Sequence, residues 1–185
     1  MRPLRPLRFS FSLIADCRLL SVFWNIEFLI MDITWVTDRI ALGGGIWNDD
    51  NMAELARKGV THIIDMQIEF DDRPLAEPYE VTVLFNPTDD DFQFKPPRLF
   101  QAGVEFALSA LEEDKNKVYI HCAAGVHRAP MMTLAILRVL GWSLKDAIHL
   151  IEGRRDVVDF ADVYVQSVEE FMKMYESVET TPKQD

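Results

Sequence analysis

A cysteine and an arginine six residues apart, Cys122 and Arg128, are the side chains of this chain best suited to chemistry. The five residues between them are mostly small: Ala123, Ala124, Gly125, Val126 and His127. A thiolate is a strong nucleophile, a planar guanidinium can bind two oxygens of a phosphoryl group, and small residues let the backbone approach an anion closely. The spacing therefore indicates a nucleophile, Cys122, in a phosphate-binding loop that ends at Arg128.

The segments on either side of this loop predict how it is positioned. Residues 118–120 have the β-branched and aromatic composition of a buried strand, and Pro130 suits the first turn of a helix that continues to Leu140. A loop that joins a strand to a helix N-terminus presents unpaired backbone N–H groups and the positive end of the helix dipole to an anion. Cys122 is expected to ionise readily there.

Three consecutive carboxylates, Asp89, Asp90 and Asp91, precede a helix predicted to open at Pro96 and to run to about Leu111. Such a run is usually a solvated turn or a helix cap. A positioned carboxylic acid that protonates a leaving oxygen, however, contributes roughly 10²- to 10⁴-fold to the rate. The residues alone leave open which of the three carboxylates is a general acid.

The segment from His121 to Arg128 resembles the signature of the cysteine-dependent protein tyrosine phosphatases, and its surroundings are most similar to the dual-specificity branch. In that branch the general acid lies upstream of the cysteine, shortly before a helix and four residues before a phenylalanine. The resemblance implies that the acid is Asp90, which lies 32 residues before Cys122, with Phe94 at the matching place. The alternatives Asp89 and Asp91 remain open.

The resemblance also implies a mechanism and a substrate class. Cys122 would attack phosphorus, Asp90 would protonate the leaving group, and water would then hydrolyse the phosphocysteine with no metal or other cofactor. His121 would support the loop, and His127 would lie at the mouth of the pocket, where contact with substrate and a solvated side chain are equal alternatives. The expected substrate is a phosphorylated protein or peptide, with phosphotyrosine first and phosphoserine or phosphothreonine as further candidates.

Two departures from the family pattern affect these expectations. The family usually has serine or threonine directly after the arginine, where this chain has Ala129, and this puts the catalytic rate in question. The family also commonly has a Pro-Asn pair after the penultimate helix. Residues 155–161 lack that pair, which puts in question how firmly the phosphate loop is held.

The size and composition of the chain limit the alternatives. The 185 residues suit a single α/β domain, and the net charge of −11 disfavours binding to nucleic acid or to an anionic membrane. Cys17 and Cys122 are the only cysteines, so no disulfide framework is indicated. A reactive thiol suits a reducing compartment, which predicts a cytoplasmic protein, and we expect a monomer.

Strands alternating with helices predict the fold and the domain boundaries. We expect short strands at 33–36, 40–42, 60–66 and 81–85, and further helices from Asp49 or Asp50 to about Lys58, at 143–152 and at 163–174. A single domain with a central mixed, partly parallel sheet flanked by helices follows, of the protein tyrosine phosphatase-like type. We assign residues 31–176 to it, 1–30 to an N-terminal extension for which a mis-assigned start is one explanation, and 177–185 to a tail. Asp65 is expected to be a turn residue, and 69–79 a surface loop.

Competing functions fit parts of the same pattern. A phosphate-binding module that docks phosphorylated partners would need Cys122 and Arg128 but not Asp90. A rhodanese-type sulfur transferase also carries a loop cysteine, and would turn over thiosulfate. A phosphatase of lipids or of RNA 5′ ends is disfavoured because the loop lacks lysine and the domain is acidic. The histidines have no acidic partner at ligand spacing, so the sequence predicts no metal site.

Overall fold

The computed structural model describes residues 31–179. The expectation of an extension at residues 1–30 therefore lies outside the described residues. The last helix runs to Glu179, so it includes the first residues of the expected tail, and residues 180–185 lie outside the described residues.

A five-stranded sheet forms the centre of the described unit. Its strands are β1 (Ile33–Trp35), β2 (Ile40–Gly43), β3 (His62–Asp65), β4 (Thr82–Phe85) and β5 (Val118–His121). Their order across the sheet is β1-β2-β5-β3-β4, with β1 antiparallel to β2 and all other neighbours parallel. The predicted mixed, partly parallel sheet is confirmed. The carboxyl ends of β3 and β5 lie side by side, since Asp65 pairs with His121.

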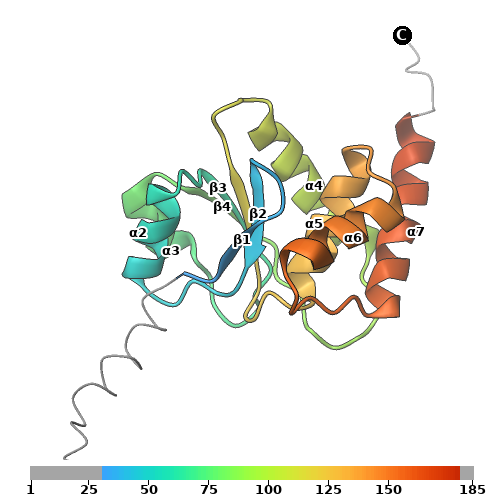
Figure 1. The fold of residues 1–185 in the computed structure, drawn as a ribbon, viewed down its shortest axis with the longest axis horizontal. Coiled ribbons are helices and arrows are strands. Elements are labelled where there is room, and N and C mark those ends of the chain that lie inside the picture. Colours follow the sequence, from blue (N-terminus) through green and yellow to red (C-terminus); the bar gives the residue numbers. More distant parts are fainter. Residues whose placement is uncertain (1–30, 180–185) are drawn as a thin grey trace, which may run out of the picture. The chain divides into compact units, whose positions relative to one another are not determined.

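Helices cover both faces of this sheet (Figure 1). One group contains α2 (Asp49–Arg57), α3 (Arg73–Ala76) and the short 3₁₀ helix η1 (Glu77–Tyr79). The other group contains α4 (Pro97–Leu111), α5 (Arg128–Val139), α6 (Leu144–Arg154) and α7 (Asp162–Glu179). In Figure 1 the two groups lie on opposite sides of the strands. Each parallel strand is thus covered on both faces, as continuous apolar strands require.

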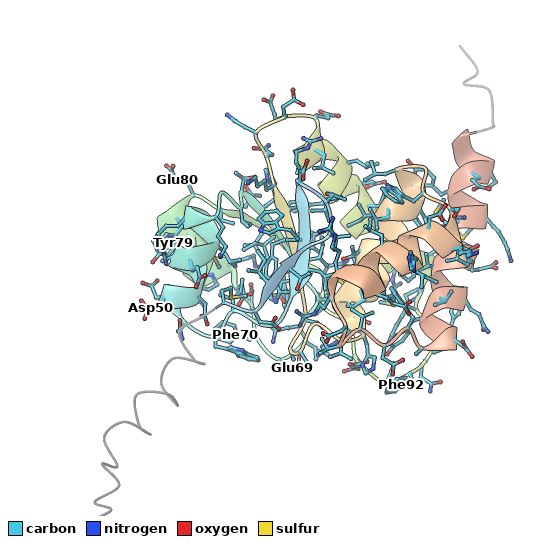
Figure 2. All side chains as sticks on the ribbon, viewed as in Figure 1. Asp50, Glu69, Phe70, Tyr79, Glu80 and Phe92 are labelled. Atoms are coloured by element: carbon cyan, nitrogen blue, oxygen red, sulfur yellow. The ribbon has the colours of Figure 1, made fainter. Side chains whose placement is uncertain are left out.

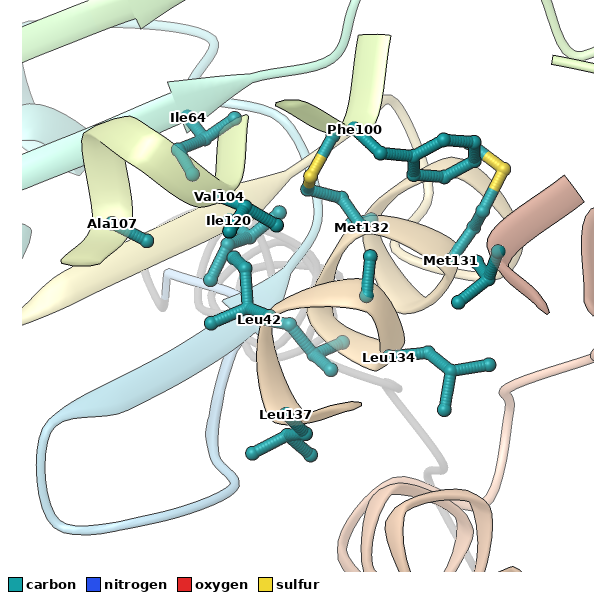
Figure 3. Close-up of a cluster of buried hydrophobic side chains, with 14 of the residues drawn as sticks. Leu42, Ile64, Phe100, Val104, Ala107, Ile120, Met131, Met132, Leu134 and Leu137 are labelled. Carbon is teal, nitrogen blue, oxygen red and sulfur yellow. The ribbon is translucent and has the colours of Figure 1, made fainter. Parts of the chain in front are cut away.

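Two hydrophobic clusters hold these layers together. The larger one joins the sheet to α4, α5 and α7 through side chains such as Leu42, Ile120, Phe100 and Met132 (Figure 3). The smaller one, around Ile63 and Leu55, packs α2 on the other face. Helix α5 is buried from Arg128 to Leu137, because it lies between the sheet and the outer helices. This burial fixes the start of α5, where the loop with Cys122 ends.

The structure corrects three details of the sequence-based elements. The cap of α2 is Asn48, whose side chain accepts from the backbone N–H of Asn51, and not Asp49 or Asp50. The segment predicted as a surface loop contains α3 and η1, each with a proline near its start, where a missing N–H costs nothing. Helix α7 is longer at both ends than the predicted 163–174. No helix within residues 31–179 has the length and apolar character needed to cross a membrane.

Candidate active site

The predicted phosphate loop lies at the carboxyl end of β5, between that strand and α5. Cys122 is a buried free thiol, and its backbone N–H donates to the carbonyl of Gly43 over 3.4 Å. The N–H of Gly45 donates to the carbonyl of Ala123 over 3.1 Å. Gly125 has a φ of +64°, and a side chain there would meet the backbone of Gly43 at 2.5 Å. The loop therefore rests directly on the backbone that follows β2, and Gly125 is required for that contact.

Arg155, the residue that follows α6, holds this loop from the other side. Its Nε donates to the carbonyl of Gly125 over 3.0 Å, and its Nη2 donates to that of Ala124 over 3.1 Å. Both terminal nitrogens also bind the carboxylate of Asp32 at 2.7 Å, and Nη1 donates to Thr34. The ion pair with Asp32 raises the pKa of Arg155. Arg155 therefore supplies a brace in the segment that lacks the family's Pro-Asn pair.

Arg128, the first residue of α5, has one edge of its guanidinium unoccupied. Nη1 and Nη2 each donate over 3.0 Å to one oxygen of Glu69, and Nη1 also donates to the carbonyl of Thr88 over 3.1 Å. These hydrogen bonds hold the pKa of the Glu69 carboxyl below its usual value. The side chain of Arg128 is only 4% exposed, and among the described residues its Nε has no hydrogen-bond partner.

The free edge of Arg128 is suited to a phosphoryl group. A guanidinium has five N–H donors in a planar fork. Glu69 uses the end formed by Nη1 and Nη2, so Nε–H and the second hydrogen of Nη2 remain along one side. Two parallel donors of this kind match two oxygens of a phosphate. The pair with Glu69 thus fixes the guanidinium without filling the edge that an anion would use.

Asp90 lies over this loop and is held by two side chains. Its Oδ2 is 3.0 Å from Nδ1 of His127 and 3.9 Å from Nε of Arg128. Its Oδ1 accepts the hydroxyl hydrogen of Tyr164, from α7, over 3.1 Å. Burial raises the pKa of the Tyr164 phenol to about 12, so this hydroxyl remains a donor at neutral pH. The structure therefore brings Asp90 together with the loop, as its expected role requires.

The two alternative carboxylates face other partners. Asp91 forms an ion pair with Lys95, which holds the pKa of the Asp91 carboxyl below its usual value. Asp89 lines a hollow of about 480 Å³ between the segment that follows β4 and the start of α4, together with Asn86, Arg98 and other residues. Neither side chain forms a described contact with Cys122 or Arg128. The geometry thus favours Asp90 among the three.

His121 is buried below the loop in a polar cluster that we call the buried triad: Asp65, Asp72 and His121. Nε2 of His121 lies 2.8 Å from Asp72 and 3.7 Å from Asp65, and its ring stacks on Tyr119. Asp65 accepts the backbone N–H groups of Gln67 and Asp72, so its predicted turn role is confirmed. Burial raises the pKa of Asp65 to about 6.

The buried triad is also the one group of three potential metal-ligating side chains within residues 31–179. Spacing along the chain did not predict this proximity, because the three residues come from β3, β5 and the loop before α3. The imidazole is in contact with one carboxylate, and backbone N–H groups occupy both oxygens of the other. Among the described residues, both oxygens of Asp72 and both ring nitrogens of His121 have no hydrogen-bond partner, although Nε2 and Oδ2 lie only 2.8 Å apart.

Several residues at the site had no signal in the sequence. Glu69 and Arg128 are 59 residues apart, and Tyr164 and Asp90 are 74 apart, so no local pattern links them. Arg155 had a weak signal, since it is a charged residue in a segment that departs from the family. Several residues that neighbour the site residues along the chain have large apolar side chains that are exposed: Trp47, Ile68, Phe70, Phe92 and Phe94. Figure 2 shows Glu69, Phe70 and Phe92 along one edge of the described unit.

Comparisons with known proteins agree with this geometry. A family model for the catalytic domain of dual specificity phosphatases matches residues 45–174. Protein phosphatase Slingshot of Drosophila melanogaster is 23% identical over 160 residues, which cover 81% of this chain and 14% of Slingshot. Human dual specificity protein phosphatase 26 is 29% identical over 113 residues, which cover 59% of this chain and 53% of that protein. The chain thus spans about half or less of these relatives.

Solved structures share the fold. The crystal structure of PTPMT1 in complex with PI(5)P has a TM-score of 0.71 and 22% identity, and covers 80% of this chain and 99% of that chain. The human tyrosine phosphatase-like serine/threonine/tyrosine-interacting protein has a TM-score of 0.64 and 21% identity, and covers 80% and 99%. At this identity the likeness shows the fold alone, and the predicted α/β class is confirmed.

Proposed function

This chain belongs to the family of dual specificity phosphatase catalytic domains, and we propose that it hydrolyses phosphate monoesters of proteins through a phosphocysteine. The free edge of Arg128 is the observation that carries this proposal. The Arg128 guanidinium is buried, lies six residues after the Cys122 thiol and keeps two parallel N–H donors unpaired. These two donors can bind two oxygens of an anion that occupies the loop. The loop amides and the N-terminus of α5 add to the same attraction.

In the first step the thiolate of Cys122 attacks phosphorus, and the bond from phosphorus to the leaving oxygen breaks. Arg128 and the loop amides stabilise the charge on the phosphoryl oxygens as the new bond forms. Asp90 gives its proton to the departing oxygen, so that the product leaves as an alcohol or phenol. The contacts with His127 and Tyr164 hold the Asp90 carboxyl in place for this transfer.

In the second step water hydrolyses the phosphocysteine. The Asp90 carboxylate takes a proton from the water as its oxygen attacks phosphorus, and the Cys122 thiolate leaves. Arg155 supports this step by binding the carbonyls of Ala124 and Gly125. Because these carbonyls point toward Arg155, the N–H groups of the loop remain available to the phosphoryl group. Inorganic phosphate then dissociates.

The surroundings of the loop support proteins as the substrate class, and phosphotyrosine as the preferred residue. The exposed rings of Phe70 and Phe92 offer apolar surface to an aryl group. A solved relative in fold holds PI(5)P, which makes a phosphoinositide the second candidate. Three carboxylates contact the end of this chain's loop, Glu69 and Asp90 at Arg128 and Asp159 at His127, and they disfavour a polyanionic headgroup.

The setting of this activity is part of the proposal. We assign the catalytic domain to residues 31–176, a range that contains the matched family model. We expect the protein to act as a monomer without a metal or other cofactor. A catalytic thiol must stay reduced, which favours the cytoplasm.

Hydrolysis of a substrate panel by the full chain tests the proposal. The panel contains peptides with phosphotyrosine, phosphoserine or phosphothreonine, PI(5)P and a nucleotide, and phosphate release is measured. We expect turnover of the phosphotyrosine peptide at the highest kcat/KM. Preferred hydrolysis of PI(5)P would instead assign a lipid substrate.

The Cys122→Ser variant separates catalysis from docking. Its hydroxyl stays protonated where the thiol ionises, so turnover should fall below detection while phosphopeptide binding persists. Arg138→Gln is a matched control, since this arginine pairs with Glu169 away from the loop. Phosphatase activity in Cys122→Ser would exclude the phosphocysteine mechanism. Binding without turnover in the wild type would assign a docking module.

A further inference from the structure

His127, the last residue of the phosphate loop before Arg128, contacts a carboxylate with each ring nitrogen. Nδ1 lies 3.0 Å from Oδ2 of Asp90, and Nε2 lies 3.5 Å from Oδ2 of Asp159. The edge of the Phe92 ring packs on the imidazole, with 5.1 Å between ring centroids. The side chain is 19% exposed, so a solvated histidine does not describe this environment. Contacts on three sides fix the orientation of the ring.

The oxygen of Asp90 that His127 contacts is also the one that faces the phosphate loop. Oδ2 is 3.9 Å from Nε of Arg128, the donor that remains free for a phosphoryl group. Oδ1 is turned away and accepts from Tyr164. A substrate held on the free edge of Arg128 would therefore meet Oδ2, and His127 lies beside the atom that must give up the proton.

We propose that His127 is a positioning residue for the general acid Asp90: it directs Oδ2 toward the leaving oxygen and stabilises the carboxylate that forms when the proton departs. This inference rests on the proposed phosphatase function. The proton moves from Oδ2 to the leaving oxygen as the bond from phosphorus to that oxygen breaks. His127 keeps its own protons, and its Nδ1–H donates to the new carboxylate. In the second step Oδ2 recovers a proton from water.

Each ring nitrogen of His127 faces a carboxylate oxygen. Asp90 from the acid loop and Asp159 from the segment after α6 contact the imidazole itself, while Arg128 from α5 and Tyr164 from α7 contact Asp90. An N–H on either ring nitrogen therefore has an acceptor. A hydrogen bond to a carboxylate is stronger than one between neutral groups.

Leaving-group dependence tests the role directly. Phenyl phosphate needs a general acid, whereas nitrophenyl phosphate departs with little help. We expect His127→Leu in the full chain to lower kcat/KM, which reports the steps through departure of the leaving group, by roughly 10- to 100-fold on phenyl phosphate and by less than about 3-fold on nitrophenyl phosphate. His127→Asn, which retains a side-chain N–H near the position of Nδ1, should recover most of that loss. His149→Leu, an exposed histidine on α6, is the matched control.

A double-mutant cycle with Asp90→Asn separates positioning from general damage to the loop. If His127 acts through Asp90, then His127→Leu should cost less than about 3-fold on phenyl phosphate once Asp90 is already Asn. Inhibition by inorganic phosphate should be unchanged in His127→Leu, because Arg128 and the loop amides remain. The alkaline limb of the kcat/KM profile, which reports the group that must be protonated, should shift in His127→Leu and stay in place in His149→Leu.

Three results would overturn this role: equal losses on both aryl phosphates, an additive loss in the Asp90→Asn background, or weaker inhibition by inorganic phosphate. If His127→Leu does not fold, as shown by its melting curve, His127→Gln carries the same comparison, because its amide reaches the position of Nε2 and leaves no N–H at that of Nδ1. Failure of the wild-type chain to turn over either aryl phosphate would instead exclude the proposed phosphatase function.

Discussion

Two parts of the site are held in different ways. The floor, which we define as loop residues 122–126 and Arg128 with Arg155 and Asp32, is fixed by backbone contacts and by an arginine that is only 7% exposed. The rim, which we define as Asp90 and His127, is held by contacts between two partly exposed side chains and by the hydroxyl of the buried Tyr164. The part that binds the anion is thus fixed by the fold, and the part that moves the proton is fixed by a few side chains.

This difference has a consequence for substitutions. Removing a side chain of the rim should change the rate of proton transfer and leave the fold intact, because water can replace the lost contacts. Removing a side chain of the floor should lower stability as well, because it leaves buried carbonyls without donors. Each prediction below separates or challenges these two behaviours, beginning with the largest expected effect.

Asp90→Asn should have the largest effect on rate and almost none on stability. We expect kcat on a phosphotyrosine peptide or phenyl phosphate to fall by roughly 10²- to 10⁴-fold, since the amide cannot donate the proton that the leaving oxygen needs. The melting temperature should stay within a few degrees of that of the wild type. The same changes at Asp89 and Asp91 are the controls. A greater loss of rate at either would show that the acid has been assigned to the wrong carboxylate.

Arg155→Met should affect both stability and rate. The carbonyls of Ala124 and Gly125 lose their donor, and Asp32 loses its partner, so we expect the free energy of unfolding to fall by about 2–3 kcal/mol. The relaxed loop should bind inorganic phosphate more weakly. Denaturant titration and phosphate inhibition measure the two effects. Arg154→Met, at the exposed neighbouring position, should change neither, and equal effects of both variants would argue against the brace.

Ala129→Ser tests whether the floor lacks a donor. Ala129 is fully buried directly after Arg128, and the family's hydroxyl at this place would assist the cysteine sulfur as it leaves. A hydrogen bond to a charged group is worth about 1.5–3 kcal/mol, so we expect the steady rate to rise by roughly 10- to 100-fold. The initial burst of nitrophenol seen by stopped flow should shrink. An unchanged burst together with an unchanged steady rate would falsify the idea that phosphocysteine hydrolysis is limited at this position.

Asp65→Asn should change how stability depends on pH. The pKa of Asp65 rises from 3.8 to about 6 on burial, so between these values the folded state holds a proton that the unfolded state has lost. The stability that this proton confers is complete below pH 3.8 and is lost as the pH rises through about 6. The variant cannot titrate.

The free energy of unfolding of Asp65→Asn, relative to that of the wild type, should therefore increase between pH 4.5 and pH 7.5 by an amount on the order of 1–3 kcal/mol. Thermal unfolding over this range measures it. Asp114→Asn, at an exposed position after α4, should show a constant difference from the wild type. A difference for Asp65→Asn that is also constant with pH would contradict the assigned protonation.

Local patterns predicted the parts of this protein that local interactions determine. The strand at Val118, the loop with Gly125 and the start of α5 near Pro130 follow from composition over a few residues. The choice of Asp90 among three carboxylates came from a resemblance and not from any local rule. Its position over the loop depends on Tyr164, which is 74 residues away in the chain.

The residues that the sequence analysis missed share one physical reason. Glu69 was assigned to a surface loop, and its segment does carry exposed side chains, but its partner Arg128 comes from another element. The buried triad likewise assembles where two parallel strands end side by side. Such pairings depend on strand order and register, which hydrophobic periodicity does not specify.

The contact between Arg155 and Asp32 joins positions 123 residues apart, and this affects how the protein is made. A ribosome produces Asp32 early and Arg155 late, with Tyr164 later still. A nascent chain that ends near residue 140 already contains Asp90, Cys122 and Arg128 but lacks the side chains that hold their loops. We therefore expect a newly made chain to become active only when its last helices have emerged and docked.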